Sequence, residues 1–235
     1  STTAPAENTF SSTFTSGGTI TKSDGTGNNW YLWILAKDNA GNTSRVKSNA
    51  FYLDNTAPTN TAPTATSTTN SVVVTFKQTD ANSGINASTR QYSIKKTSDS
   101  SWGAWVTDAN SAHTFTGLTL NTEYQVRTQV KDALGNGYTV SGIKTITTVN
   151  ITKPTITLST TAPTNQNITA TITYPSISGI TKQYSYDNKT WQTYTSALTI
   201  DSNKTIYARS IDSTSQGSDS TRVASLTVSN IDKTS

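Results

Sequence analysis

One six-residue motif occurs twice in this chain, 94 positions apart, and this repetition limits the possible folds more than any other feature of the sequence. The pattern K-D-x-x-G-N is found at residues 37–42 and again at 131–136, and a degenerate copy begins at Asp212. Self-similarity at such a period is typical of tandem modules, here of about 80–95 residues each. Two tripeptides recur as well: Ser-Gly-Ile at 83–85 and 178–180, and Gln-Tyr-Ser at 91–93 and 183–185.

Short segments rich in Thr and Pro separate these repeats. They read LDNTAPT at 53–59 and NITKPT at 150–155, and the last six residues, NIDKTS, resemble them. Proline stiffens such a joint, and its missing N–H discourages the flanking sheets from fusing. Because NIDKTS resembles a linker, we expect the parent chain to continue in both directions. The predicted units are residues 1–56, residues 57–149 and residues 150–235.

Each unit is expected to consist of β-strands. Turn residues separate short runs rich in β-branched and aromatic residues, and no window shows helical periodicity. Only 32% of the residues are hydrophobic, which suits strands with one solvent-exposed face. We therefore predict an all-β fold of tandem two-sheet sandwiches. The strands expected in the middle unit are 71–76, 90–96, 102–106, 113–118, 123–131 and 138–148.

The strand before each copy of the motif is expected to have one inward face. Alternate residues of a strand point to the same side of its sheet. In the middle unit this rule predicts an inward face made of Tyr124, Val126, Thr128 and Val130. Aligning the Asp residues of the motifs gives the counterparts Trp30, Leu32, Ile34 and Ala36 in the first unit, and Ile206, Ala208 and Ser210 in the third.

The repeated motif is either a structural corner or a ligand site. Gly41 and Gly135 permit a positive φ, Asn42 and Asn136 tolerate one, and an Asp at the start of a turn accepts backbone N–H bonds. These properties predict a hairpin corner. The alternative is a calcium loop, because Asp and Asn oxygens suit that ion. Each loop has one carboxylate and lacks D-x-D-x-D spacing, so the corner is favoured and no other cofactor is expected.

Composition argues against several classes of function. The chain has no Cys, so neither disulfides nor thiolate metal sites can form. Its net charge is +4, but Lys and Arg are scattered, and Lys95–Lys96 is their only adjacent pair. Without a basic stripe, no nucleic-acid partner is expected. No run reaches the ~18–20 apolar residues of a membrane span.

Enzymatic activity is not expected either. His113 is the only histidine, and by alternation with Phe115 it points inward as a partly buried strand residue. Glycoside hydrolysis would require two carboxylates placed across a cleft. Asp80, Asp99 and Asp108 are turn residues by their context, and the sequence singles out no such pair.

The tryptophans are candidates for a sugar-binding platform. Trp102, Trp105 and Trp191 could stack on sugar rings, as in carbohydrate-binding modules. Trp102 and Trp105 are three positions apart on an expected strand, so they are predicted to face opposite sides, one of them in the core. Core packing is the favoured interpretation of these residues. If a glycan is bound, Trp105 is the residue predicted to contact it.

The middle unit resembles a fibronectin type III domain along its whole length. The resemblance rests on APTAT at 62–66, on Tyr92 followed by two tryptophans, and on FTGLTLNTEYQV at 115–126. In the last stretch, Leu118 and Tyr124 match the inward Leu and the corner Tyr of that family. The segments 31–44 and 51–59 resemble the end of a bacterial surface Ig-like repeat, and the segments 183–194 and 205–212 resemble bacterial Ig-like or chitobiase-C-terminal-type modules.

These resemblances imply a structural function outside the cell. Such modules serve as stalks, spacers or adhesive units of secreted bacterial proteins. We therefore expect a non-enzymatic stalk or filament segment, extracellular or on a bacterial cell surface, whose partners are neighbouring modules of the parent chain. The alternatives are an adhesin or carbohydrate-binding module that contacts surface glycans, and an accessory segment of a secreted glycan-degrading enzyme or phage tail protein.

The first unit is expected to be an incomplete sandwich. The offset of the motifs aligns Ser1 with Lys95, inside the third expected strand of the middle unit, so the first strands are missing from residues 1–56. An open sheet edge and an exposed inner face should result. The unit is a proteolytic remnant, an experimental truncation, an ordered remnant of a longer chain, or a half-domain completed by strands of another copy.

Overall fold

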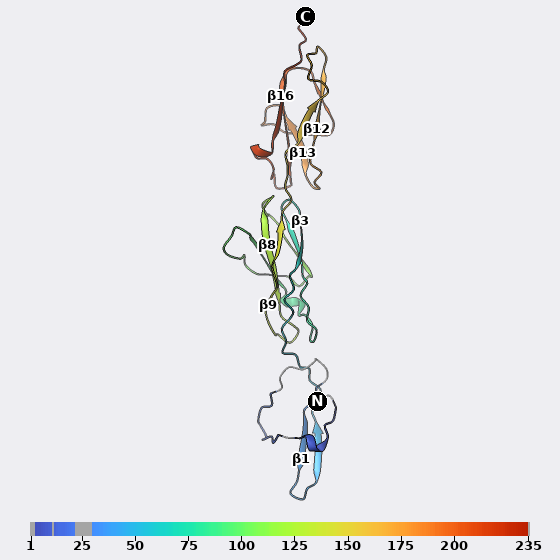
Figure 1. Ribbon diagram of the computed structural model, residues 1–235, viewed down its shortest axis with the longest axis vertical. Helices are drawn as coiled ribbons and strands as arrows, with labels where there is room; N and C mark the ends of the chain where they lie inside the picture. Colours follow the sequence, from blue (N-terminus) through green and yellow to red (C-terminus); the bar gives the residue numbers. More distant parts are fainter. Residues whose placement is uncertain (1–2, 11, 22–29, 235) are drawn as a thin grey trace.

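The computed structural model describes residues 3–10, 12–21 and 30–234, and its regular elements are β-strands and three short 3₁₀ helices. The units follow one another along one long axis, with β1 near one end and the C-terminus at the other (Figure 1). The prediction of an all-β fold is confirmed. Among the described residues, no helix has the length and apolar character needed to cross a membrane. The 3₁₀ helices are η1 (Glu7–Thr9), η2 (Ala87–Thr89) and η3 (Ser220–Arg222).

The strands between residues 64 and 147 form the middle sandwich. One sheet has the order β3-β4-β7, and the other has the order β10-β8-β5-β6 with β9 also beside β8; all neighbours are antiparallel. The bounds are β3 (Thr64–Ser67), β4 (Val72–Thr75), β5 (Gln91–Lys96), β6 (Val106–Thr107), β7 (Ala112–Phe115), β8 (Glu123–Val130), β9 (Thr139–Val140) and β10 (Lys144–Thr147).

The core of the middle sandwich combines side chains from both of its sheets. Val72 and Val74 of β4 pack with Tyr92 of β5 and Val126 of β8, and all four are fully buried. Burial of these groups is the main favourable contribution to folding. The predicted inward face of β8 is buried throughout, at Tyr124, Val126, Thr128 and Val130.

The strand expected at 102–106 is wrong. Residues 102–105 have no regular structure, and β6 comprises only Val106 and Thr107. At Gly103 the backbone approaches β5 very closely: its N–H donates to the carbonyl of Ile94 at 3.1 Å, and an added Cβ would lie 2.6 Å from that oxygen. Only glycine allows this approach, and it interrupts the regular ladder.

The strands between residues 155 and 228 form the C-terminal sandwich. Its sheets have the orders β11-β12-β15 and β14-β13-β16-β17, again antiparallel. Its own core includes Ile168, Ile200 and Ile206, and the predicted inward residues Ala208 and Ser210 are fully buried. The bounds are β11 (Thr155–Leu158), β12 (Ile168–Thr173), β13 (Thr181–Ser185), β14 (Gln192–Thr193), β15 (Leu198–Ile200), β16 (Lys204–Ile211) and β17 (Ala224–Val228).

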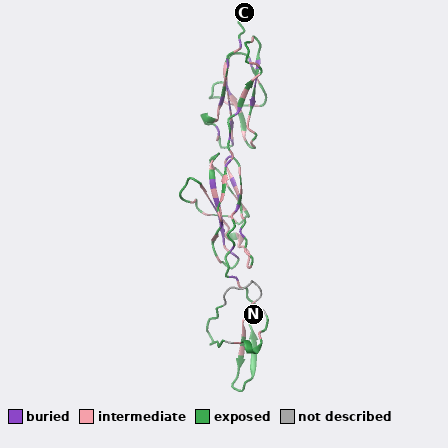
Figure 2. Cartoon of the chain, viewed as in Figure 1, coloured by how far each residue is buried: buried purple, intermediate pink, exposed green. Residues whose placement is uncertain are grey.

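The N-terminal unit contains a two-stranded hairpin of β1 (Trp33–Lys37) and β2 (Thr43–Lys47). In the described part of the chain β1 pairs only with β2, whereas β8 and β16 have partners on both edges. Ile34, predicted to point inward, is 40% exposed, whereas Trp33 and Leu35 on the other face of β1 are half-buried, so the inward face predicted for this strand is wrong. Buried residues are concentrated in the two sandwiches (Figure 2), in agreement with the expected incomplete first unit.

Candidate functional site at the joints between the sandwiches

The repeated motif folds into one corner with the same hydrogen bonds each time. At Asp38, one carboxylate oxygen accepts the N–H groups of Ala40 and Asn42, at 3.0 and 2.8 Å, and the other accepts the Asn42 side-chain amide at 2.8 Å. Gly41 has a φ of +91°. The predicted hairpin corner is therefore confirmed, and its Asp is an anchor for backbone N–H groups.

The second corner adds a contact outside its own loop. Asp132 accepts the N–H groups of Leu134 and Asn136, at 2.9 and 2.8 Å, and the Asn136 side-chain amide at 2.6 Å. The same amide also donates to the carbonyl oxygen of Asp54, at 2.7 Å. Asp54 belongs to the segment that leads into the middle sandwich, so this corner holds the preceding linker.

The third, degenerate corner reaches further still. Asp212 accepts the N–H groups of Thr214 and Gln216, at 2.8 and 3.0 Å. The Gln216 amide nitrogen donates to the carbonyl of Leu118 at 3.0 Å, and its oxygen accepts the N–H of Leu120 at 2.7 Å. Leu118 and Leu120 lie between β7 and β8, so Gln216 bridges the two sandwiches directly.

The linker before the C-terminal sandwich is packed into that sandwich. Ile151 is fully buried, and Arg222 donates to the carbonyl of Ile151 at 2.8 Å and to the side chain of Asn150 at 2.6 Å. Asp219 pairs with the Arg222 guanidinium at 3.0 Å and orients it. Gly217 allows the close fit, because an added Cβ would lie 2.4 Å from the carbonyl oxygen of Ser210.

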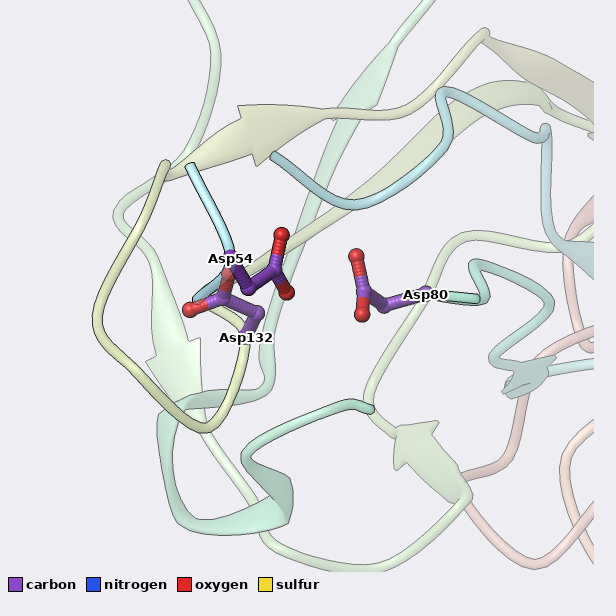
Figure 3. Close-up of side chains that lie close together, drawn as sticks. All are labelled: Asp54, Asp80 and Asp132. Atoms are coloured by element: carbon purple, nitrogen blue, oxygen red, sulfur yellow. The ribbon is translucent and has the colours of Figure 1, made fainter. Parts of the chain in front are cut away.

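Three carboxylates converge at the joint before the middle sandwich. Asp54 comes from the linker, Asp80 from the loop after β4, and Asp132 from the second corner (Figure 3). One oxygen from each lies within 4.8 Å of the others. Asp54 and Asp132 are buried and Asp80 is half-buried. No ion pair reaches any of the three within the described ranges, where the pairs found involve Asp108, Asp201 and Asp219.

Hydrogen bonds from neutral groups stabilise these charges. The Asp80 carboxylate accepts the N–H groups of Asn82 and Gly84, at 3.1 and 2.8 Å. Asp54 accepts the N–H groups of Thr56 and Ser83, at 3.0 and 2.9 Å. Burial acts to raise the pKa of Asp54, but the bonds from Ser83 and Thr56 outweigh it and hold that pKa well below its usual range.

The geometry of this acidic cluster is compatible with a divalent cation. Calcium takes oxygen ligands at about 2.3–2.6 Å, so two ligands of one ion lie at most about 5 Å apart, and the three carboxylates meet that limit. The loop of Asp132 by itself contains one carboxylate, and Asp54 and Asp80 are far away from it in the chain. The Asp in the linker LDNTAPT is the sequence feature that could have indicated this cluster. In the described part of the chain, Asp38 is not in such a cluster.

Trp102 and Trp105 do not face opposite sides, so that prediction is wrong. Both rings lie on the guanidinium of Arg127, whose central carbon is 4.1 Å from the Trp102 ring centre and 4.7 Å from that of Trp105. The strand alternation on which the prediction depended is absent at 102–105. In the C-terminal sandwich, Arg209 lies 4.0 Å from the Trp191 ring in the same way. Such cation–π stacks stabilise a fold. Glycan contact by Trp105 remains a prediction.

His113 and Tyr124 lie where the sequence places them. His113 is half-buried on β7, with its ring stacked on Tyr92 and its Nδ1 2.9 Å from the Asp108 carboxylate. The Tyr124 hydroxyl accepts the N–H of Thr119 at 3.0 Å, which fixes the loop between β7 and β8. That loop is the one to which Gln216 binds, so the corner Tyr also orients the joint.

Comparisons with known proteins give a distant structural similarity. No family model matches this chain, and no curated protein matches it. Among solved structures, it is similar to the FN1–FN3 domains of chicken CNTN1, at 14% sequence identity and a TM-score of 0.35, over 83% of this chain and 76% of that one. The strand order of the chain itself defines its class: an all-β protein of antiparallel sandwiches connected by short joints.

Proposed function

We propose that this chain is a non-enzymatic stalk or filament segment of a bacterial extracellular repeat protein, which spaces or presents other domains. The observation that carries the proposal is the presence of two separate hydrophobic cores, one built from β4, β5 and β8 and one from β12, β15 and β16. The chain passes from one sandwich to the next along the long axis (Figure 1). Each sandwich therefore adds its own length to the reach of the chain.

The joints support this role. A spacer requires units that do not fold back on one another, and short linkers held by hydrogen bonds limit such motion. Asn136 holds the linker before the middle sandwich, and Arg222 with buried Ile151 holds the linker before the C-terminal sandwich.

The open edge of β1 favours pairing with a strand from another copy or from a neighbouring part of the parent chain. β8 pairs with β5 on one edge and with β9 and β10 on the other, and β16 pairs with β13 and β17. Within the described residues β1 has β2 alone. An added antiparallel strand would satisfy the backbone groups along that edge.

The Trp102–Arg127–Trp105 stack favours a second candidate function, glycan binding by an adhesive module. Both rings are half-buried, and each lies against the Arg127 guanidinium. A partly exposed aromatic ring offers a flat apolar face on which a sugar ring can stack. A glycan-array signal from the wild type that is lost in Trp105→Ala would support this candidate over a purely structural role.

Small-angle X-ray scattering with light scattering tests the spacer proposal. A compact chain of 235 residues has a radius of gyration of roughly 18 Å, and an in-line rod of the same mass exceeds this clearly. We expect an elongated particle whose dimensions do not change with salt concentration. A compact monomer would contradict the proposal. A concentration-dependent oligomer, dissolved by a peptide that pairs with β1, would identify strand exchange between copies.

A further inference from the structure

We propose that the guanidinium of Arg127, with Trp102 and Trp105 against it, binds the carboxylate of an acidic sugar. This inference rests on the second candidate function, glycan binding, and names the class of glycan. The site lies on the outer face of a sheet of the middle sandwich. Val126 of β8 is buried in the core, so Arg127, the next residue of the same strand, points away from the core.

Arg127 differs from the other arginines in its hydrogen bonds. Within the described ranges its guanidinium donates no hydrogen bond and belongs to no ion pair, and its Nε is buried without a partner. Every other arginine donates at least one hydrogen bond. The acceptors are the carbonyl of Pro5 for Arg45, the carbonyl of Ala109 for Arg90, the carbonyl of Ile151 for Arg222 and the side chain of Gln183 for Arg209. The donors of Arg127 are therefore available to a ligand.

The stack in the C-terminal sandwich serves as an internal reference. Arg209 lies 4.0 Å from the centre of the Trp191 ring, and its Nε donates to Oε1 of Gln183 at 2.8 Å. Burial lowers the pKa of both Arg209 and Arg127, because desolvation disfavours the charged form. At Arg209 an acceptor within the fold offsets this effect. In the described part of the chain Arg127 has no such acceptor, and an anionic ligand would supply it.

The surroundings of Arg127 add a second positive charge. Lys95 Nζ lies 5.5 Å from the centre of the Trp102 ring, so both cations lie against the same indole. Nζ donates to the carbonyl of Asp99 at 2.9 Å, and no carboxylate pairs with Lys95 within the described ranges. The site is therefore cationic, which favours an anion over a neutral group.

A carboxylate attached to a sugar ring fits this arrangement. The planar guanidinium presents parallel N–H groups that match the two oxygens of a carboxylate. Trp102 and Trp105 hold the guanidinium between them, which reduces the side-chain entropy lost on binding. A uronic acid carries its carboxylate directly on the ring, so the ring itself would lie beside the half-buried indoles and can stack on them.

Titration calorimetry with matched probes tests this inference. The probes are a short oligogalacturonate, the neutral galactose oligomer of the same length and linkage, and acetate, which has a carboxylate but no ring. We expect the oligogalacturonate to bind the wild type at least about tenfold more tightly than either of the others. The neutral sugar lacks the charge-assisted hydrogen bonds, and acetate lacks the ring contact.

The other outcomes separate this inference from the functions on which it depends. Equal affinity for the two oligosaccharides would overturn it and leave glycan binding intact. Equal affinity for oligogalacturonate and acetate would overturn it in favour of a site for any small anion. No binding of oligogalacturonate would overturn it as well, and the glycan array then decides whether glycan binding fails too. The spacer function is tested separately by scattering.

Arg127→Lys separates the shape of the guanidinium from its charge. Lys keeps a positive charge beside the rings but has no parallel pair of N–H groups. We expect the affinity for oligogalacturonate to fall at least about tenfold, with a urea midpoint close to that of the wild type. Arg209→Lys, the same substitution in the other stack, is the matched control and should change the affinity less than about twofold. An unchanged affinity in Arg127→Lys would overturn the inference, and the comparison of probes on the wild type does not depend on the stability of this variant.

Discussion

The side-chain amide of Gln216 donates a hydrogen bond to the backbone carbonyl of Leu118, 98 residues earlier in the chain, at 3.0 Å. This bond joins the corner of one sandwich to the loop that follows β7 in the other. The same loop is held from its own side by the hydroxyl of Tyr124. The joint is therefore built on a loop that the middle sandwich has already ordered.

Gln216→Ala should lower the stability of the C-terminal sandwich by about 1–2 kcal/mol, since it removes the bonds to Leu118 and Leu120 and leaves both backbone groups without that partner. Urea unfolding followed by fluorescence measures this change. The exposed Gln166 provides the control, since Gln166→Ala should change stability by less than about 0.5 kcal/mol. Equal effects of the two substitutions would contradict an energetic role for the bridge.

Tyr124→Phe should destabilise the middle sandwich by about 1 kcal/mol. The ring keeps its packing, but the Thr119 N–H loses its acceptor in a partly buried loop. We expect a lower urea midpoint with an unchanged slope. Tyr138 is 45% exposed, so Tyr138→Phe is the matched control and should be close to neutral. An unchanged midpoint for Tyr124→Phe would mean that water replaces the hydroxyl.

Asp80→Asn should raise the melting temperature of the middle sandwich by about 2–4 °C in buffer free of divalent cations. Asn retains an oxygen that can accept the N–H groups of Asn82 and Gly84, and the substitution removes one of three charges that converge within 4.8 Å. Asp99→Asn, at an exposed turn outside the cluster, should have little effect.

Melting curves of the wild type and of Asp80→Asn, measured with added calcium, decide whether the cluster holds this ion. A rise in the melting temperature of the wild type that is absent in Asp80→Asn would identify a cation site. A melting temperature for Asp80→Asn at or below that of the wild type without divalent ions would contradict the expected charge repulsion.

Stability should decrease as the pH falls from about 4 to about 2. Bonds from Lys204 and Ser202 lower the pKa of Asp201 to about 2, and the bond with His113 lowers the pKa of Asp108. Because the folded-state pKa values lie below the unfolded ones, the unfolded chain binds more protons in this range, and stability rises with pH. Chemical unfolding at a series of pH values measures the slope. Asp201→Asn should make the slope shallower, and an unchanged slope would rule out a contribution from this group.

Much of the fold could be predicted from local patterns. Alternation along β8 identified Tyr124, Val126, Thr128 and Val130 as inward, because a period of two follows from strand geometry alone. The strand at 102–106 was wrong because Gly103 brings the backbone against β5, a contact that no local pattern records. The pairing of Trp102 and Trp105 on Arg127 was missed for the same reason.

The repeat, the all-β class and the corner follow from local sequence patterns, since an Asp followed by Gly and Asn specifies its own turn through bonds within six residues. What each corner contacts depends on tertiary packing. Asp54, Asp80 and Asp132 meet only after the linker lies against the middle sandwich. Gln216 finds Leu118 only after two separately folded sandwiches are aligned. Such contacts depend on the relative positions of distant segments, which the packing of two cores fixes and which short-range sequence patterns do not encode.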